Sequence, residues 1–107
     1  MANTFKNVRS ILTDTLADVY TVPAATTVIV IGCHVTNVGA TNGELTMAWT
    51  DSSNSDAATY LAQAIVVPDA AAYEPVGKLV LEAGDKIRAN ANAASTLEMT
   101  VSVLEQS

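Results

Sequence analysis

Hydrophobic and polar residues alternate over short stretches of this chain, and Gly, Pro or Asn interrupts the pattern about every ten residues. The alternation is clearest over residues 44–50, where Leu45, Met47 and Trp49 share one face. Similar runs predict further strands, which span residues 18–22, 26–37 and 59–67, with three shorter strands within residues 76–104. About seven or eight short strands at this spacing predict an all-β domain, which we expect to be a single antiparallel β-sandwich with jelly-roll or Greek-key connections.

Residues 26–37 form the strongest predicted strand, since β-branched side chains dominate the segment. Its nearly continuous apolar stretch predicts burial on both faces. Turns are expected at residues 38–43, where an Asn-Gly pair marks a hairpin, and at residues 83–85 and 92–95. Residues 69–75 carry small side chains and are expected to connect two strands without forming one.

The first residues of the chain carry a different pattern. Phe5, Val8 and Ile11 recur at a spacing of three, which also suits a helix, but we favour an extended N-terminal arm. The arm is expected over residues 1–16 and the sandwich domain over residues 17–107.

Composition limits the size of the core and the range of partners. Half of the 107 residues are hydrophobic, but only 5% are aromatic, so the core of this single small domain is thin and association with another subunit is expected. The net charge of −6 repels phosphate backbones and anionic lipids, which argues against nucleic-acid and membrane partners. No apolar run approaches the ~20 residues of a spanning helix.

Cys33 and His34 are the single cysteine and the single histidine of the chain. Neighbours on a strand point to opposite faces, so these two side chains do not form a metal site or a nucleophile–base pair. We expect Cys33 in the core and His34 on the outside. A lone cysteine makes no internal disulfide, which fits a reducing compartment such as the cytoplasm.

The acidic residues suggest structural roles. Asp51, Asn54 and Asp56 loosely resemble a calcium-binding loop, but they lack the ligand spacing and distal Glu of an EF-hand, so solvated turn residues are favoured. Asp85 follows Gly84 and is expected to bond its own turn backbone. No two carboxylates are placed as an acid–base pair, so we expect neither an enzyme nor a cofactor.

Two further features have alternative interpretations. Trp49 is expected in the core, although an exposed indole could also stack on a sugar ring. Lys78, Lys86 and Arg88 form the only local basic group of an acidic chain, which favours an electrostatic contact with a neighbouring subunit.

Four motifs, in their order and spacing, resemble those of small virion structural proteins of tailed bacteriophages. The motifs are YTVPA (residues 20–24), VIVIGCHVTN (28–37), LEAGDKIR (81–88) and VSVLE (101–105). The resemblance covers about residues 17–105 and leaves the N-terminal arm outside.

This resemblance implies a β-sandwich virion protein without enzymatic activity and without catalytic residues to transfer. The favoured role is a capsid decoration, or cement, protein that binds and stabilises the assembled shell of major capsid protein. Such a protein is located in the virion, which assembles in the host cytoplasm. The alternatives are a neck, collar or tail-fibre-associated virion protein and, in another class, a carbohydrate-binding adhesion module.

Assembly is expected through exposed strand edges, which bind other chains by β-addition, and through the basic residues. We expect a homo-oligomer, with a trimer favoured, that also contacts other virion proteins. The residues expected at these contacts are Phe5, Lys6, Val8, Arg9, Ile11, Lys78, Lys86 and Arg88.

Overall fold

The structure is a computed structural model that describes residues 2–107, with the side chain of Val76 excepted. Over this range the chain forms nine strands and one 3₁₀ turn, η1. They are β1 (Asn3–Ile11), β2 (Ala17–Thr21), β3 (Thr27–Asn37), β4 (Gly43–Asp51), η1 (Ser52–Asn54), β5 (Ala57–Val67), β6 (Ala72–Val76), β7 (Leu79–Leu81), β8 (Lys86–Ala91) and β9 (Leu97–Gln106). None of the described residues forms a helix long and apolar enough to cross a membrane.

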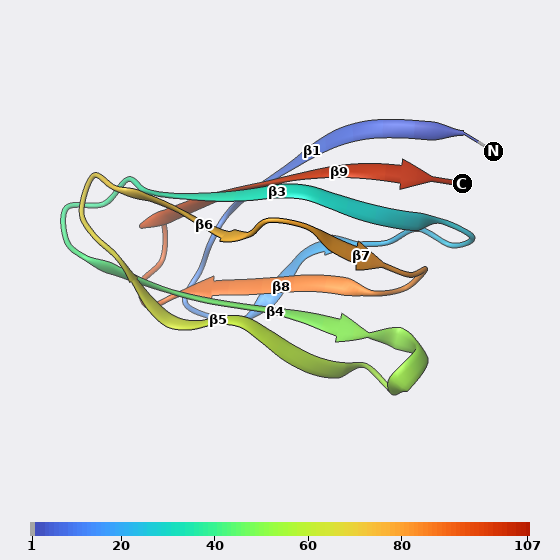
Figure 1. Cartoon of the computed structure of the whole chain (residues 1–107). Helices are drawn as coiled ribbons and strands as arrows, with labels where there is room; N and C mark the ends of the chain where they lie inside the picture. The colour runs from blue at the N-terminus through green and yellow to red at the C-terminus, as the bar shows by residue number, and fades with distance from the viewer. Residues whose placement is uncertain (1) are drawn as a thin grey trace.

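The strands form two antiparallel sheets that lie face to face (Figure 1). Sheet A has the order β1-β9-β3-β6, with β7 paired to β3 on the same side as β6, and sheet B has the order β2-β8-β4-β5. The chain passes between the sheets after β1, β2, β3, β5, β7 and β8, so sequence neighbours lie mostly in opposite layers. This strand order is that of a jelly roll, and the predicted antiparallel sandwich is confirmed.

The predicted connection at residues 69–75 is partly wrong, because Ala72–Val76 form β6. β3 is eleven residues long and β7 covers only its first part, so the rest of β3 is free to pair with β6. Pro75 lacks an N–H group and is tolerated because β6 is an edge strand. Pairing with a long neighbour therefore outweighs the weak strand propensity of this segment.

The predicted burial of β3 on both faces is wrong. Val28 and Val30 are fully buried between the sheets, whereas Ile29 and Ile31 are exposed on the outer face of sheet A. A two-layer sandwich has no third layer to cover that face, so even a strongly apolar strand buries only alternate residues. The core is the inner face of both sheets, and its largest fully buried side chains are Leu45, Met47, Leu81, Ile87, Leu97, Met99, Val28, Val30, Val35, Val67, Val101 and Val103.

The N-terminal segment is extended, as predicted. Asn3 to Ile11 pair in continuous antiparallel register with Glu98 to Gln106 of β9. β1 is thus an edge strand of sheet A within this chain, and it lies beside β9 at the end of the molecule that holds both termini (Figure 1). The division of the chain into residues 1–16 and 17–107 stays a prediction.

Candidate functional site

The residues predicted at assembly contacts lie on separate parts of the sandwich. Those from Phe5 to Ile11 are all on β1, at one edge of sheet A. Lys78 precedes β7 at the opposite edge of sheet A, whereas Lys86 and Arg88 lie on β8 in sheet B. The structure therefore separates Lys78 from the basic group expected from the sequence, and the assembly role of all these residues stays a prediction.

Side chains of β1 divide between the two faces of sheet A. Phe5 is 74% exposed, and Arg9 and Ile11 are exposed with it on the outer face. Lys6 and Val8 point inward, where Lys6 Nζ lies 3.5 Å from Glu105 Oε2 and Val8 packs against the core. The Lys6 side chain is nevertheless about half exposed, so both faces of β1 present side chains to solvent.

The backbone of β1 presents a row of unpaired groups at the edge of sheet A. Ala2 and Ser107 exchange two hydrogen bonds, of 2.9 and 3.0 Å. In an antiparallel pair such bonded pairs alternate with non-bonded pairs, so even-numbered residues of β1 bond to β9. The N–H and C=O groups of Asn3, Phe5 and the other odd-numbered residues therefore point away from β9. These are the groups that bind an added strand.

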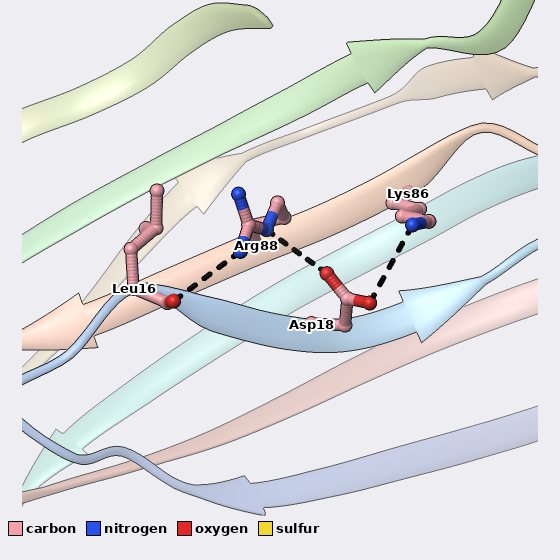
Figure 2. Close-up of polar contacts among 4 residues, drawn as sticks. All are labelled: Leu16, Asp18, Lys86 and Arg88. Carbon is pink, nitrogen blue, oxygen red and sulfur yellow. Dashed lines mark hydrogen bonds and ion pairs between the residues drawn. The ribbon is translucent and has the colours of Figure 1, made fainter. Parts of the chain in front are cut away.

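The basic residues of β8 are already paired within the chain (Figure 2). Arg88 Nε donates to Asp18 Oδ1 at 2.9 Å, and Lys86 Nζ lies 3.7 Å from Asp18 Oδ2. Arg88 Nη2 also donates to the Leu16 carbonyl at 3.3 Å. Asp18 on β2 thus offsets part of this positive charge. Lys86 and Arg88 are therefore less available for the predicted electrostatic contact with a neighbouring subunit.

A partly buried polar contact joins the two sheets at the end of the sandwich near the chain termini. The Tyr20 hydroxyl on β2 donates to Glu105 Oε2 on β9 at 2.5 Å, and Lys6 of β1 approaches the same oxygen. Burial, followed by the bond to Glu105 and its negative charge, raises the pKa of Tyr20 well above its ordinary value. The neutral hydroxyl therefore persists as the donor.

Replacing Tyr20 by Phe is expected to lower the free energy of unfolding by about 1–2 kcal/mol, because a partly buried carboxylate loses its donor. Urea unfolding at neutral pH measures the change. Tyr73→Phe is the matched control, since Tyr73 is exposed on edge strand β6, and we expect less than about 0.5 kcal/mol there. Equal losses in the two variants would contradict the role given to the Tyr20 hydroxyl.

Cys33 and His34 lie on opposite faces of β3, as predicted. Cys33 is buried, and burial raises the pKa of its thiol from 9.0 to about 12. His34 is exposed, with Nδ1 3.9 Å from Glu74 Oε1 on β6. A buried, protonated thiol is neither a nucleophile nor available to a cysteine of another chain.

The Cys33 thiol makes stability depend on alkaline pH. Its pKa is higher in the folded state, so between about pH 9 and 12 it ionises mainly in the unfolded chain, and stability falls as pH rises. From pH 8 to 10.5 the loss due to Cys33 is about 2 kcal/mol. Urea unfolding of wild type and of Cys33→Ala at both pH values measures this loss. The difference between the two proteins is due to the thiol, because all other groups titrate in both. An identical pH dependence in the two proteins would contradict the raised pKa.

Three carboxylates come together at one end of the sandwich, and the sequence did not predict this. Oxygens of Asp51, Glu82 and Asp85 lie within 4.8 Å of one another. Asp85 is only 1% exposed, and its carboxylate accepts from Ser52 N at 2.9 Å, Ser52 Oγ at 3.0 Å and Glu82 N at 2.9 Å. Asp85 therefore bonds its own turn, as predicted, and also ties that turn to η1. The Ser52 hydroxyl has one hydrogen and also lies 2.9 Å from the Ala83 carbonyl oxygen, so the two backbone N–H groups are the donors that serve Asp85 alone.

The loop that loosely resembled a calcium site is a structural turn. Asp51 Oδ1 accepts from Ser53 N at 3.2 Å and from Ser53 Oγ at 2.7 Å, which caps η1. Asn54 and Asp56 are exposed, in agreement with the preferred interpretation as solvated turn residues. The carboxylates near Asp51 come instead from the β7–β8 turn, and no local sequence pattern connects these two turns.

Trp49 lies on the inner face of sheet B and is partly buried. It is directly opposite buried Ile87 on β8 and packs against the hydrophobic core. Its packing against the core agrees with the expected core position, and the carbohydrate-binding alternative stays a prediction. No cavity or cleft opens among residues 2–107.

Comparison with known proteins identifies solved structures of similar fold but no family. No family model and no curated protein matches the chain. Among solved structures, the chain is similar to a protein of Bacillus endospore appendages, described as a novel family of disulfide-linked pili. That match has a TM-score of 0.61 and 13% identity, and covers 99% of this chain and 87% of the other.

A second similar structure is the acid-stable capsid of the Helicobacter pylori bacteriophage KHP30. The TM-score is 0.58 at 8% identity, and the match covers 98% of this chain and 87% of the other. At these identities the likeness concerns the fold alone. The chain therefore has a two-sheet fold that is also found in a pilus and in a phage capsid.

Proposed function

We propose that this chain is a non-enzymatic structural protein of a bacteriophage virion, and specifically a decoration protein that binds and stabilises the assembled capsid shell. The observation that carries the proposal is the likeness of fold, over 98% of the chain, to a protein in the KHP30 capsid structure. The motif resemblance to tailed-phage virion proteins supports the same role.

The geometry of the chain supports a protein that works through its surfaces. β1 offers an open strand edge, and Phe5, Arg9 and Ile11 accompany it on the outer face. The groups that most resemble reactive chemistry have structural roles instead, since Cys33 is buried and protonated and Asp85 is bonded to two turns. We propose that β1 pairs with a strand of a neighbouring virion protein.

The pilus likeness suggests a second assembly, but covalent linkage does not fit this chain. The pili of the Bacillus endospore appendages are disulfide-linked. This sequence has a single cysteine, Cys33, and the structure buries it. A disulfide link through Cys33 is therefore not expected, which favours the capsid role.

The number of copies in a purified virion tests the role. A decoration protein repeats with the shell and is expected in hundreds of copies per particle. A neck, collar or tail-associated protein follows the symmetry of a single axis and is expected in about a dozen. Quantitative mass spectrometry against the major capsid protein distinguishes the two, and absence from the virion would contradict both.

Pairing at the open edge of β1 is tested by Asn7→Pro. Asn7 is odd-numbered, so proline removes an N–H that faces the open edge and no bond to β9. We expect occupancy on the particle to fall at least tenfold, while the isolated protein stays folded. Asn7→Ala is the control, because both variants lose the bond from Ser102 Oγ to the Asn7 side chain but only proline lacks the N–H. Normal occupancy of the folded proline variant would contradict β-addition at β1.

A further inference from the structure

The outer face of sheet A carries an apolar row that crosses four strands. Phe5 of β1 is directly opposite Leu104 of β9, Leu104 is opposite Ile29 of β3, and Ile29 is opposite Val80 of β7. Directly opposed residues of antiparallel strands share a face, and this one is the solvent face. Phe5, Ile29 and Val80 are 74%, 41% and 64% exposed, and Ile31 adds a further exposed side chain beside the row.

A charged row crosses the same face, four residues further along β1. Arg9 of β1 is opposite Thr100 of β9, Thr100 is opposite His34 of β3, and His34 contacts Glu74 of β6. Arg9 and Glu74 are both exposed, and they lie at opposite edges of the sheet. The distance between the two rows along β1 is about 13 Å, from a rise of ~3.3 Å per residue.

The two rows together make this face complementary to itself. Consider two copies whose outer faces are in contact, related by a twofold axis that lies between the faces, parallel to the strands and midway between β9 and β3. This rotation places the β1 edge of one copy opposite the β6–β7 edge of the other. Each row then meets its own counterpart in reversed order. Phe5 faces Val80, Leu104 faces Ile29, and Arg9 of each copy faces Glu74 of the other.

We propose that the outer face of sheet A binds a second copy of this chain in a twofold, face-to-face dimer. The charged row favours this occupant, because a row with a cation at one edge and an anion at the other matches its own rotated image. Glu98 of β9, two residues beyond this row, would face Thr36 of the other copy. Sheets that pack face to face keep their strands within about 30° of each other, so the rows stay in contact.

The size of the face agrees with a dimer of modest affinity. Four strands at ~4.8 Å spacing and about nine residues of length give a footprint of roughly 600 Å² per copy. Two copies would bury about 1,200 Å², near the lower limit for stable interfaces. The contact leaves the backbone edge of β1 free, so it is compatible with β-addition there and does not depend on the proposed virion role. It differs from the trimer favoured by the sequence.

A reciprocal charge swap tests the arrangement in the purified full chain. Sedimentation equilibrium over low to high micromolar concentrations is expected to show a monomer–dimer equilibrium. Arg9→Glu alone, or Glu74→Arg alone, places like charges opposite each other twice per dimer and should raise the dissociation constant about five- to tenfold. The double variant Arg9→Glu/Glu74→Arg restores both pairs and should return the constant to within about twofold of wild type.

Val80→Asp tests the apolar row and should raise the dissociation constant at least tenfold, since it buries a carboxylate against Phe5 of the other copy, beside Leu104 of the same row. Val66→Asp is the control, because Val66 is 55% exposed on β5 in sheet B. The proposal is overturned if the wild-type chain is monomeric throughout or trimeric, if Val66→Asp weakens association as much as Val80→Asp, or if the double charge swap does not rescue either single change. Circular dichroism of each variant shows that it is folded.

Discussion

Replacing Asp85 by Ala is expected to lower the free energy of unfolding by about 3–4 kcal/mol, a large part of the stability of a small domain. The backbone N–H groups of Ser52 and Glu82 donate to this carboxylate, and the Ser52 hydroxyl donates as well. Alanine leaves both N–H groups without an acceptor in a site where Asp85 is almost fully buried. The β7–β8 turn and η1 then lose the residue that holds them together.

Urea unfolding at neutral pH measures this loss, and two further variants sharpen it. Asp85→Asn keeps one acceptor oxygen but turns an N–H₂ group toward at least one donor, so an intermediate loss of about 2 kcal/mol is expected. Asp69→Ala removes an exposed carboxylate from a surface turn, at a residue whose own φ is not positive, and should cost less than about 0.5 kcal/mol. A loss at Asp85→Ala no larger than at Asp69→Ala would contradict the bonding described for this turn.

Ile87→Ala is expected to cost about 3–4 kcal/mol, whereas Ile29→Ala should cost less than about 1 kcal/mol. Ile87 lies on β8 between β2 and β4, opposite Tyr20 and Trp49, and is 0% exposed. Its truncation opens a cavity in a thin core. Ile29 lies on the outer face of sheet A and is 41% exposed, so its truncation leaves no closed cavity.

Denaturant unfolding below the concentration at which the chain associates compares the two isoleucines. Low concentration matters because Ile29 lies in the proposed dimer face, and association would add to its apparent contribution. Similar losses for both variants would support burial of β3 on both faces, which is the interpretation that the apolar sequence favoured and the structure contradicts.

Local patterns predicted most of the fold. Alternation over residues 44–50 placed Leu45 and Met47 in the core, and the neighbours Cys33 and His34 lie on opposite faces as a strand requires. The Ala-Gly-Asp turn was also found, with Asp85 bonded to its own backbone. These features depend on strand periodicity and turn stereochemistry, which a few consecutive residues determine.

Predictions failed where distant segments decide the outcome. β6 forms because β3 extends beyond β7, and Ile29 and Ile31 are exposed because the sandwich has no third layer. The meeting of Asp51 with Asp85 depends on how two turns from different strand pairs approach each other. None of these outcomes has a signal within one segment.

By itself, the sequence determined most of the strands, the alternation of β4 and the positions of the turns, because each depends on neighbours within a few positions of the chain. It did not show that the expected hairpin at residues 38–43 instead connects β3 and β4 in different sheets. Only the tertiary structure decided which strands are adjacent, and thereby which outward residues form rows. Phe5 and Val80 share a row, and Arg9 and Glu74 share another, only through β9 and β3, which lie between them. Register across several strands is a property of the whole sheet, because pairing of the inner face sets it and the outer residues follow.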